Sequence, residues 1–250
     1  MCCFSRQVES VSNTNVFARS SKEGRQFLVY SMSIKSKEEL AMILPIPVPS
    51  GSPDDAVRFV DLKDYDKFFV DMLAGFPVPK TLAAADRSRS APPKTDSKPL
   101  PVVEVGNFEA SFVPSIRDFS RLDERFRLPD ATWAELPAYR EYGFTVFKLK
   151  QGAQTLHPMA FEFPRANPKK LFFPTVHIHD GKVHAKAGFD HTLYCQTSAG
   201  EALPMNEWSE SFGLASQFMK VDKSKGIVDG TAHCYKRTIR GVQKNEDTLV

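Results

Sequence analysis

The chain has 250 residues, of which 42% are hydrophobic and 25% are charged, a balance typical of a globular protein large enough to bury one core. Its 33 basic and 30 acidic residues leave a net charge of only +3. No run of Lys and Arg is interleaved with aromatic residues as a nucleic-acid groove requires. We therefore expect a single domain over residues 1–250 and no nucleic-acid partner.

The N-terminus lacks the pattern of a secretion signal, because Met-Cys-Cys-Phe leads directly into polar Ser5 and Arg6. No stretch of about 18 apolar residues is present, so no membrane span is predicted. The expected location is the cytoplasm. In that reducing compartment cysteines are expected to be thiols or metal ligands rather than disulfides, and the chain has four, at Cys2, Cys3, Cys195 and Cys234.

Three strands are predicted near the start of the chain, over residues 16–19, 25–34 and 39–48. In the second, apolar side chains alternate onto both faces, which is typical of a central strand. The third ends in Ile-Leu-Pro-Ile-Pro-Val-Pro. Proline cannot donate a ladder hydrogen bond, so this end is expected at a sheet edge or outside the sheet.

Two helices are predicted next, a short one that carries Ala56, Val57 and Phe59, and an amphipathic one over residues 64–73. The composition then changes. Residues 77–101 contain six prolines, several Lys and Arg and no aromatic residue. This segment is predicted to be an exposed, mobile loop within the domain.

The rest of the chain is predicted to contain mainly strands. Strands are expected to resume at residues 101–105 and 108–113, and short helices are expected at residues 115–122 and 130–139. Further strands are predicted over residues 144–150, 155–163, 170–179, 182–185 and 191–197. A helix is predicted over residues 206–218 and mostly irregular chain after residue 226. These elements predict an α+β fold with a predominantly antiparallel, sandwich-like β-sheet and short peripheral helices.

Five of the six histidines fall between His157 and His191, on predicted strands. Asp180-Gly181 in their midst predicts a two-residue type I′ turn, which would make His177 and His184 cross-strand neighbours. His179 would share their face, while Ile178 and Val183 would occupy the opposite, apolar face.

Three imidazoles on one face predict a metal site, as in three-histidine zinc centres, and copper and iron also suit imidazole. The leading hypothesis is a metal-binding protein, and a metalloenzyme if the metal activates water. The predicted ligands are His177, His179 and His184, with a Cys2 or Cys3 thiolate or His191 nearby. A small molecule or peptide would then be the substrate. Alternatively, these histidines are merely exposed residues beside a turn.

Cys2 offers a second chemistry. Removal of Met1 would leave a free amine and a thiol on Cys2, which could act as a nucleophile with its own amine, or a histidine such as His191, as the base. A metal-free thiol enzyme is therefore the second hypothesis. The alternative at this position is a frayed terminus with an accidental cysteine pair.

Several segments together carry a resemblance: Met-Cys-Cys-Phe-Ser, Gly-Arg-Gln-Phe-Leu-Val-Tyr-Ser-Met, Leu-Ala-Met-Ile-Leu-Pro-Ile-Pro-Val-Pro and Phe-Phe-Pro-Thr-Val-His-Ile-His-Asp-Gly. On these the chain resembles an uncharacterised bacterial family of conserved proteins, over most of its length except residues 77–101. The resemblance implies no activity and no catalytic residue. The third hypothesis is therefore a non-enzymatic binding or scaffold module that contacts a partner through the hairpin and the Pro-rich loop.

Overall fold

The computed structural model describes residues 2–76, 103–105, 108–179, 182–197, 203 and 207–250. The predicted Pro-rich loop and the turn residues Asp180 and Gly181 lie outside the described residues. No helix in the described ranges is long and apolar enough to cross a membrane.

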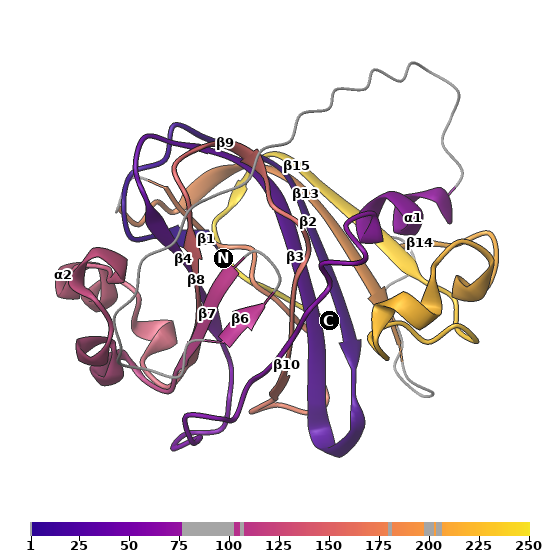
Figure 1. Ribbon diagram of the computed structural model, residues 1–250, viewed down its shortest axis with the longest axis horizontal. Coiled ribbons are helices and arrows are strands. Elements are labelled where there is room, and N and C mark those ends of the chain that lie inside the picture. Colours follow the sequence, from indigo (N-terminus) through magenta and orange to yellow (C-terminus); the bar gives the residue numbers. More distant parts are fainter. Residues whose placement is uncertain (1, 77–102, 106–107, 180–181, 198–202, 204–206) are drawn as a thin grey trace.

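The larger sheet has eight strands, in the order β14-β15-β13-β2-β3-β10-β5, with β9 also pairing with β3 (Figure 1). The strand β3 has neighbours on both sides, which confirms the prediction of a central strand. The strands of the larger sheet are β2 Ser10–Ser20, β3 Arg25–Ser36, β5 Arg58–Val60, β9 Gly152–Thr155, β10 Met159–Pro164, β13 Lys186–Gln196, β14 Ser209–Glu210 and β15 Tyr235–Lys244.

The smaller sheet has six strands, in the order β12-β1-β4-β8-β7-β6. Pro45 lies within β4 and pairs with Phe144 of β8, whereas β1 reaches only Met42 and Ile43 on the other side of β4. At Pro45 the strand therefore has one neighbour, as an edge strand does. The strands of the smaller sheet are β1 Cys2–Phe4, β4 Leu40–Ile46, β6 Val103–Val105, β7 Phe108–Val113, β8 Gly143–Leu149 and β12 His177–Ile178. Outside both sheets, β11 Phe172–Phe173 pairs with β16 Thr248–Leu249.

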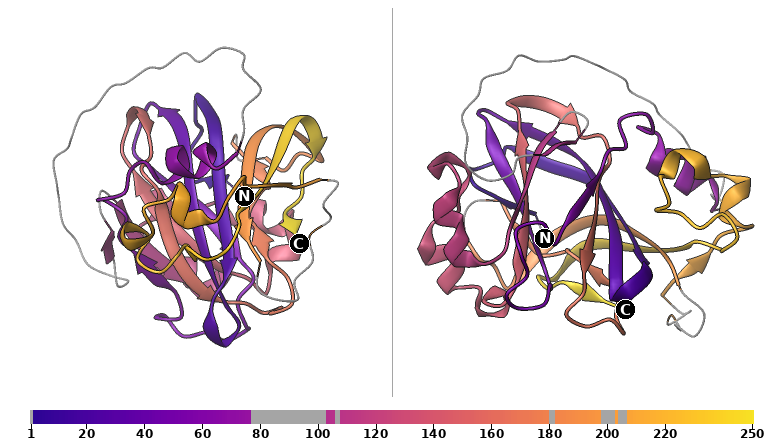
Figure 2. Two further views of the ribbon diagram at one scale, coloured as in Figure 1. Left: turned by 90° about the vertical axis from the view of Figure 1, so that its right-hand side faces the viewer. Right: turned by 60° about the horizontal axis from the view of Figure 1, so that its bottom comes forward.

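The largest core cluster takes side chains from both sheets, such as Tyr30 and Phe161 from the larger and Met42 and Phe147 from the smaller. Two further clusters lie under the helices, which occupy opposite sides of the molecule (Figures 1 and 2). The helices are α1 Phe68–Ala74 and α2 Asp130–Ala134, with 3-10 turns η1 Lys22–Gly24, η2 Ile116–Arg121, η3 Glu124–Phe126, η4 Pro137–Tyr139, η5 Ala215–Gln217 and η6 Val221–Ser224.

The β-rich composition and the short helices agree with the predicted fold class, but the sheets are mixed. β1 runs parallel to β12, and β13 runs parallel to β2. The sandwich-like arrangement stays a prediction. Three local predictions are wrong: the helix at residues 56–59 is replaced by β5, the helix over 206–218 by β14 and η5, and the irregular C-terminal segment by β15 and β16.

Candidate functional site

His177 is positioned by its strand and by one remote side chain. β12 runs beside β1, so that Cys2 is the register partner of His177 and Cys3 that of Ile178. Asn245 accepts a hydrogen bond from the His177 amide at 2.7 Å and donates to the carbonyls of His177 and His184, both at 2.9 Å. The predicted strand over residues 182–185 is not formed. A side-chain amide therefore joins the two segments that we expected to pair through a backbone ladder.

Three imidazoles meet at this point, and we call His177, His179 and His191 the histidine cluster. His177 Nδ1 lies 3.1 Å from His179 Nε2, within hydrogen-bonding distance. The ring centres of His177 and His191 are 4.6 Å apart. Phe189 packs its ring edge against His177, with centres 4.6 Å apart, and also contacts His191. His184 is exposed, so His191 takes the place that we predicted for His184.

Burial controls the charge of the cluster. Burial, together with a smaller effect of the neighbouring imidazoles, lowers the pKa of His177 to about 3 and that of His191 to about 2. Both rings are therefore neutral at physiological pH. Neither ring nitrogen of His191, nor Nε2 of His177, has a hydrogen-bond partner within the described part of the chain.

The prediction of a metal centre is wrong. Within the described ranges, no group of three or more His, Cys, Asp or Glu side chains is placed to hold a metal ion. The physical reason is the direct contact between His177 and His179, which directs one ring nitrogen at the other instead of directing both at a common ion. His184 faces solvent, and Cys3 packs into the apolar cluster with Ile178.

The cysteines do not supply an accessible thiol in the described residues. Cys3, Cys195 and Cys234 are fully buried thiols. Burial raises the pKa of Cys234 to about 12, so it stays protonated. Cys2 is placed only by its backbone register beside His177. The catalytic roles that the sequence suggests for Cys2 and His191 remain predictions.

A second feature, which the sequence did not indicate, is an exposed apolar patch. We define the apolar patch as Val70 and Leu73 of α1 with Phe212 and Leu214, which are 65%, 43%, 63% and 38% exposed. These are four of the six large exposed hydrophobic residues in the described part of the chain; two lie on α1, and two lie on the segment that the Phe212 amide joins to the end of α1. The sequence predicted a helix over residues 206–218, and that helix gave no indication that Phe212 lies next to α1.

The two halves of the apolar patch are held together by direct contacts. The Phe212 amide donates to the carbonyl of Gly75, at the end of α1, at 2.9 Å. The Phe212 ring packs on Phe218 with centres 5.9 Å apart. Phe218 in turn lies against Gly75, where an added Cβ would meet its ring at 2.5 Å. Figure 1 shows α1 beside the gold segment that carries these residues.

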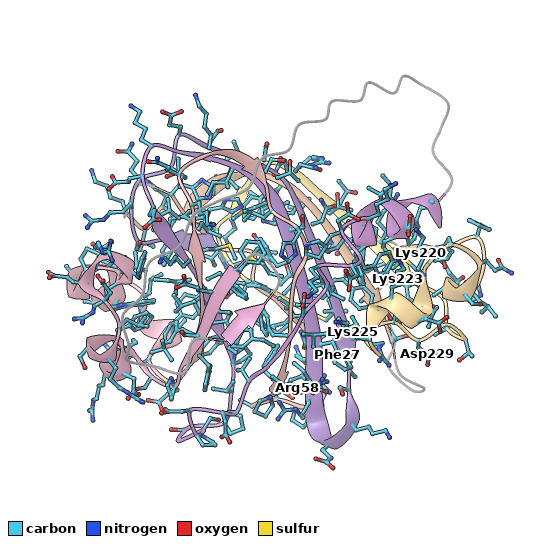
Figure 3. All side chains as sticks on the ribbon, in the orientation of Figure 1. Phe27, Arg58, Lys220, Lys223, Lys225 and Asp229 are labelled. Carbon is cyan, nitrogen blue, oxygen red and sulfur yellow. The ribbon has the colours of Figure 1, made fainter. Side chains whose placement is uncertain are left out.

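A third feature is an arginine-lined cavity of about 640 Å³. The guanidinium groups of Arg19 and Arg58 lie 5.3 and 5.8 Å from the ring centre of Phe27, and Figure 3 labels Phe27 and Arg58. The Arg58 guanidinium also binds Glu162 at 3.0 Å, and Arg19 donates to the carbonyl of Ile227. Both arginines therefore already have partners within the protein, and these contacts connect the segments that line the cavity.

The fold and the histidine cluster together define a β-rich protein of mixed sheets in which His177 and His191 are buried. No family model and no curated protein matches the chain. Among solved structures, it is similar to the crystal structure of baculovirus P35, with 13% identity, a TM-score of 0.45 and coverage of 97% of this chain and 96% of that one.

Two further structures of the same kind are similar. One is a mutated baculovirus P35 after caspase cleavage, with 13% identity, a TM-score of 0.47 and coverage of 95% and 99%. The other is the caspase-8/P35 complex, with 12% identity, a TM-score of 0.45 and coverage of 95% of each chain. Likenesses at this level assign no activity to this chain, and the resemblance to a bacterial family stays a prediction.

Proposed function

We propose that this chain is a non-enzymatic binding module that recognises a protein partner through the apolar patch. The observation that carries the proposal is the concentration of exposed Val70, Leu73, Phe212 and Leu214 on one surface. Contiguous exposed apolar side chains on a folded protein mark interaction sites, because their exposure to water has a free-energy cost that a partner removes.

The buried groups favour binding over catalysis. An imidazole whose pKa lies at about 2 or 3 takes up a proton poorly, so His177 and His191 make weak general bases near neutral pH. The thiols of Cys195 and Cys234 are enclosed in the core. The alternative of a thiol enzyme depends on Cys2 alone, and mass spectrometry after iodoacetamide treatment tests its reactivity.

The partner surface is expected to be apolar at its centre. Phe212 is the residue on which binding should depend most, because aromatic side chains dominate the energetics of protein interfaces. Replacing Phe212 and Val70 by serine should weaken binding by about 2 kcal/mol or more, which is roughly 30-fold in Kd.

The experiment compares three proteins: wild type, the Val70→Ser/Phe212→Ser variant, and Leu249→Ser as the matched control. Leu249 is 53% exposed and lies on β16, which is not part of the apolar patch. Partners captured from cell extract by wild type are made recombinantly and titrated by calorimetry against all three. Caspase-8, the enzyme present in the solved P35 complex, is included as a defined protein probe.

The proposal predicts at least one purified partner that binds wild type and Leu249→Ser equally and binds the double variant much more weakly. Equal affinity for all three proteins would show that the apolar patch is not the binding surface. Thermal unfolding of the double variant by circular dichroism verifies that its fold is retained.

A further inference from the structure

The strand β15 leaves most of one edge of the larger sheet unpaired in the described part of the chain. Along one side it pairs with β13 over ten positions, from Tyr235 to Lys244. Along the other side β14 covers only Tyr235 and Lys236. Figure 2 shows β15, in yellow, at the margin of the sheet. Backbone donors and acceptors from Arg237 onward are therefore available to another strand, apart from the carbonyl of Arg240, which accepts from the Gln243 side chain, and that of Lys244, which accepts from the Glu246 amide.

This edge carries charge of one sign. The sequence Tyr-Lys-Arg-Thr-Ile-Arg-Gly-Val-Gln-Lys contains four basic residues and no acidic one. A cavity of about 450 Å³ adjoins the strand, and Arg237, Ile239 and Arg240 line it together with Phe189 and Thr175. Lys244 and Glu246, which form an ion pair with each other, also line it, so the cavity combines an apolar wall with the cationic Arg237 and Arg240 and one paired carboxylate.

The chain itself shows which kind of strand this edge accepts. The short strand β14 carries Glu210, which accepts a hydrogen bond from the Tyr235 hydroxyl at 3.1 Å. Just before β14, Glu207 forms an ion pair with Arg237 at 3.0 Å. The first positions of the edge are therefore covered by β14 and the turn before it, which together supply two carboxylates.

We propose that the remaining edge of β15 binds an acidic, extended polypeptide segment by strand addition, with its alternate side chains reaching the cavity beside Ile239. Main-chain hydrogen bonds would supply affinity, and the carboxylates would match the basic side chains. Two copies of β15 would place like charges opposite one another, which disfavours self-pairing. This site is separate from the apolar patch and does not depend on it.

The probe is a fluorescein-labelled decapeptide that alternates Glu and Val, followed by fluorescence anisotropy. Two further peptides carry N-methyl groups on every Glu amide or on every Val amide. In an added strand only alternate amides face the edge, so one methylated peptide should bind at least roughly tenfold more weakly and the other should bind like the parent. Equal binding of all three peptides would mean simple charge attraction and would overturn the proposal.

The protein variant is Arg240→Glu/Lys244→Glu, and its matched control is Lys220→Glu/Lys223→Glu, which changes the charge equally. Lys220 and Lys223 are exposed and lie beside α1, as Figure 3 shows. The edge variant should lose at least roughly tenfold in affinity and the control much less. If both variants lose affinity equally, the edge is not the site.

A parent peptide that fails to bind overturns the proposal outright. Sedimentation analysis then identifies a second copy as the occupant if the protein forms dimers that Arg240→Glu makes more stable, because this substitution relieves the contact between like charges. Circular dichroism confirms folding of each variant, and the peptide comparison on wild-type protein keeps the test decisive if a variant unfolds.

Discussion

His191 illustrates how its surroundings change what a histidine does. Its side chain is 1% exposed, and its ring packs against His177 and Phe189. The same imidazole at the surface would titrate near neutral pH. Here the cost of burying a charge keeps it neutral, so it behaves as an aromatic core residue.

This burial predicts a specific acid sensitivity. As pH falls, the unfolded chain takes up a proton at His191 near pH 6.5, whereas the folded chain does so only at about pH 2. Between these values protonation favours the unfolded chain, so stability present above pH 6.5 is lost by up to about 1.4 kcal/mol per pH unit. His191→Phe should therefore lose up to about 2 kcal/mol less than wild type between pH 7 and pH 5.

Urea unfolding at both pH values measures this difference. His184→Gln is the control, because it removes a histidine of the neighbouring segment that is exposed rather than buried. If wild type and His191→Phe lose the same stability on acidification, His191 is not the group responsible.

Sequence alternation could place some of these residues but not their neighbours. Ile178 does lie in an apolar cluster, with Val183 packed against it, as the alternation predicted. The contacts that define the histidine cluster come from Phe189 and Asn245, which lie on other strands or beyond them. Nothing local to residues 177–184 indicates these partners, so a local pattern suggested a metal site where the fold provides an apolar enclosure.

At the scale of elements, Asn245 takes over the role of a strand ladder. Its side chain accepts from the amide of His177 and donates to two carbonyls, and its backbone amide donates to the carbonyl of Ala185 at 3.0 Å. One residue thus joins the end of β15 to the segments on either side of the turn.

Asn245→Ala should lower the free energy of unfolding by about 1–3 kcal/mol, because a part-buried amide loses its acceptor. Chemical denaturation measures the loss. Gln243→Ala is a suitable comparison, since Gln243 is exposed and its side chain donates only to the carbonyl of Arg240, and it should stay within about 0.5 kcal/mol of wild type. Equal effects of the two substitutions would argue against the bridging role of Asn245.

Strands rich in apolar residues were predictable, and exposed ones were not. β4 is apolar at every position and β3 carries six apolar residues among its twelve, and the predicted strands overlap both closely. β15 carries four basic residues and is mostly exposed, so its composition resembles that of a loop. Its strand conformation comes from pairing with β13, which no short window of sequence contains.

At the scale of the whole molecule, the last described residues join distant parts of the chain. Asp247 accepts hydrogen bonds from the amides of Thr175 and Val176, at 2.9 and 3.1 Å, and from the hydroxyl of Tyr139 at 2.6 Å. β16 then pairs with β11. The smaller sheet, the η4 turn and the C-terminal strand are thereby connected through one carboxylate.

Asp247→Ala should destabilise the protein by about 2–3 kcal/mol, because it removes a charged acceptor from two backbone amides and a buried hydroxyl. The neighbouring carboxylate is the control: Glu246→Ala removes only a surface pair with Lys244 and should change stability by less than about 0.5 kcal/mol. Thermal unfolding of both variants tests the difference. Similar melting temperatures for the two variants would contradict this assignment.

The parallel pairing of β2 with β13 has a consequence for how the chain is made. Residues 14–19 acquire their partner only when residues 191–196 have left the ribosome. During most of synthesis the hairpin of β2 and β3 therefore has an open, apolar margin, and a nascent chain in this state is prone to aggregate. Formation of the larger sheet must also wait for a loop closure across most of the sequence, which makes folding slow. We therefore expect the nascent chain to depend on chaperones until β13 has left the ribosome, and much less after that.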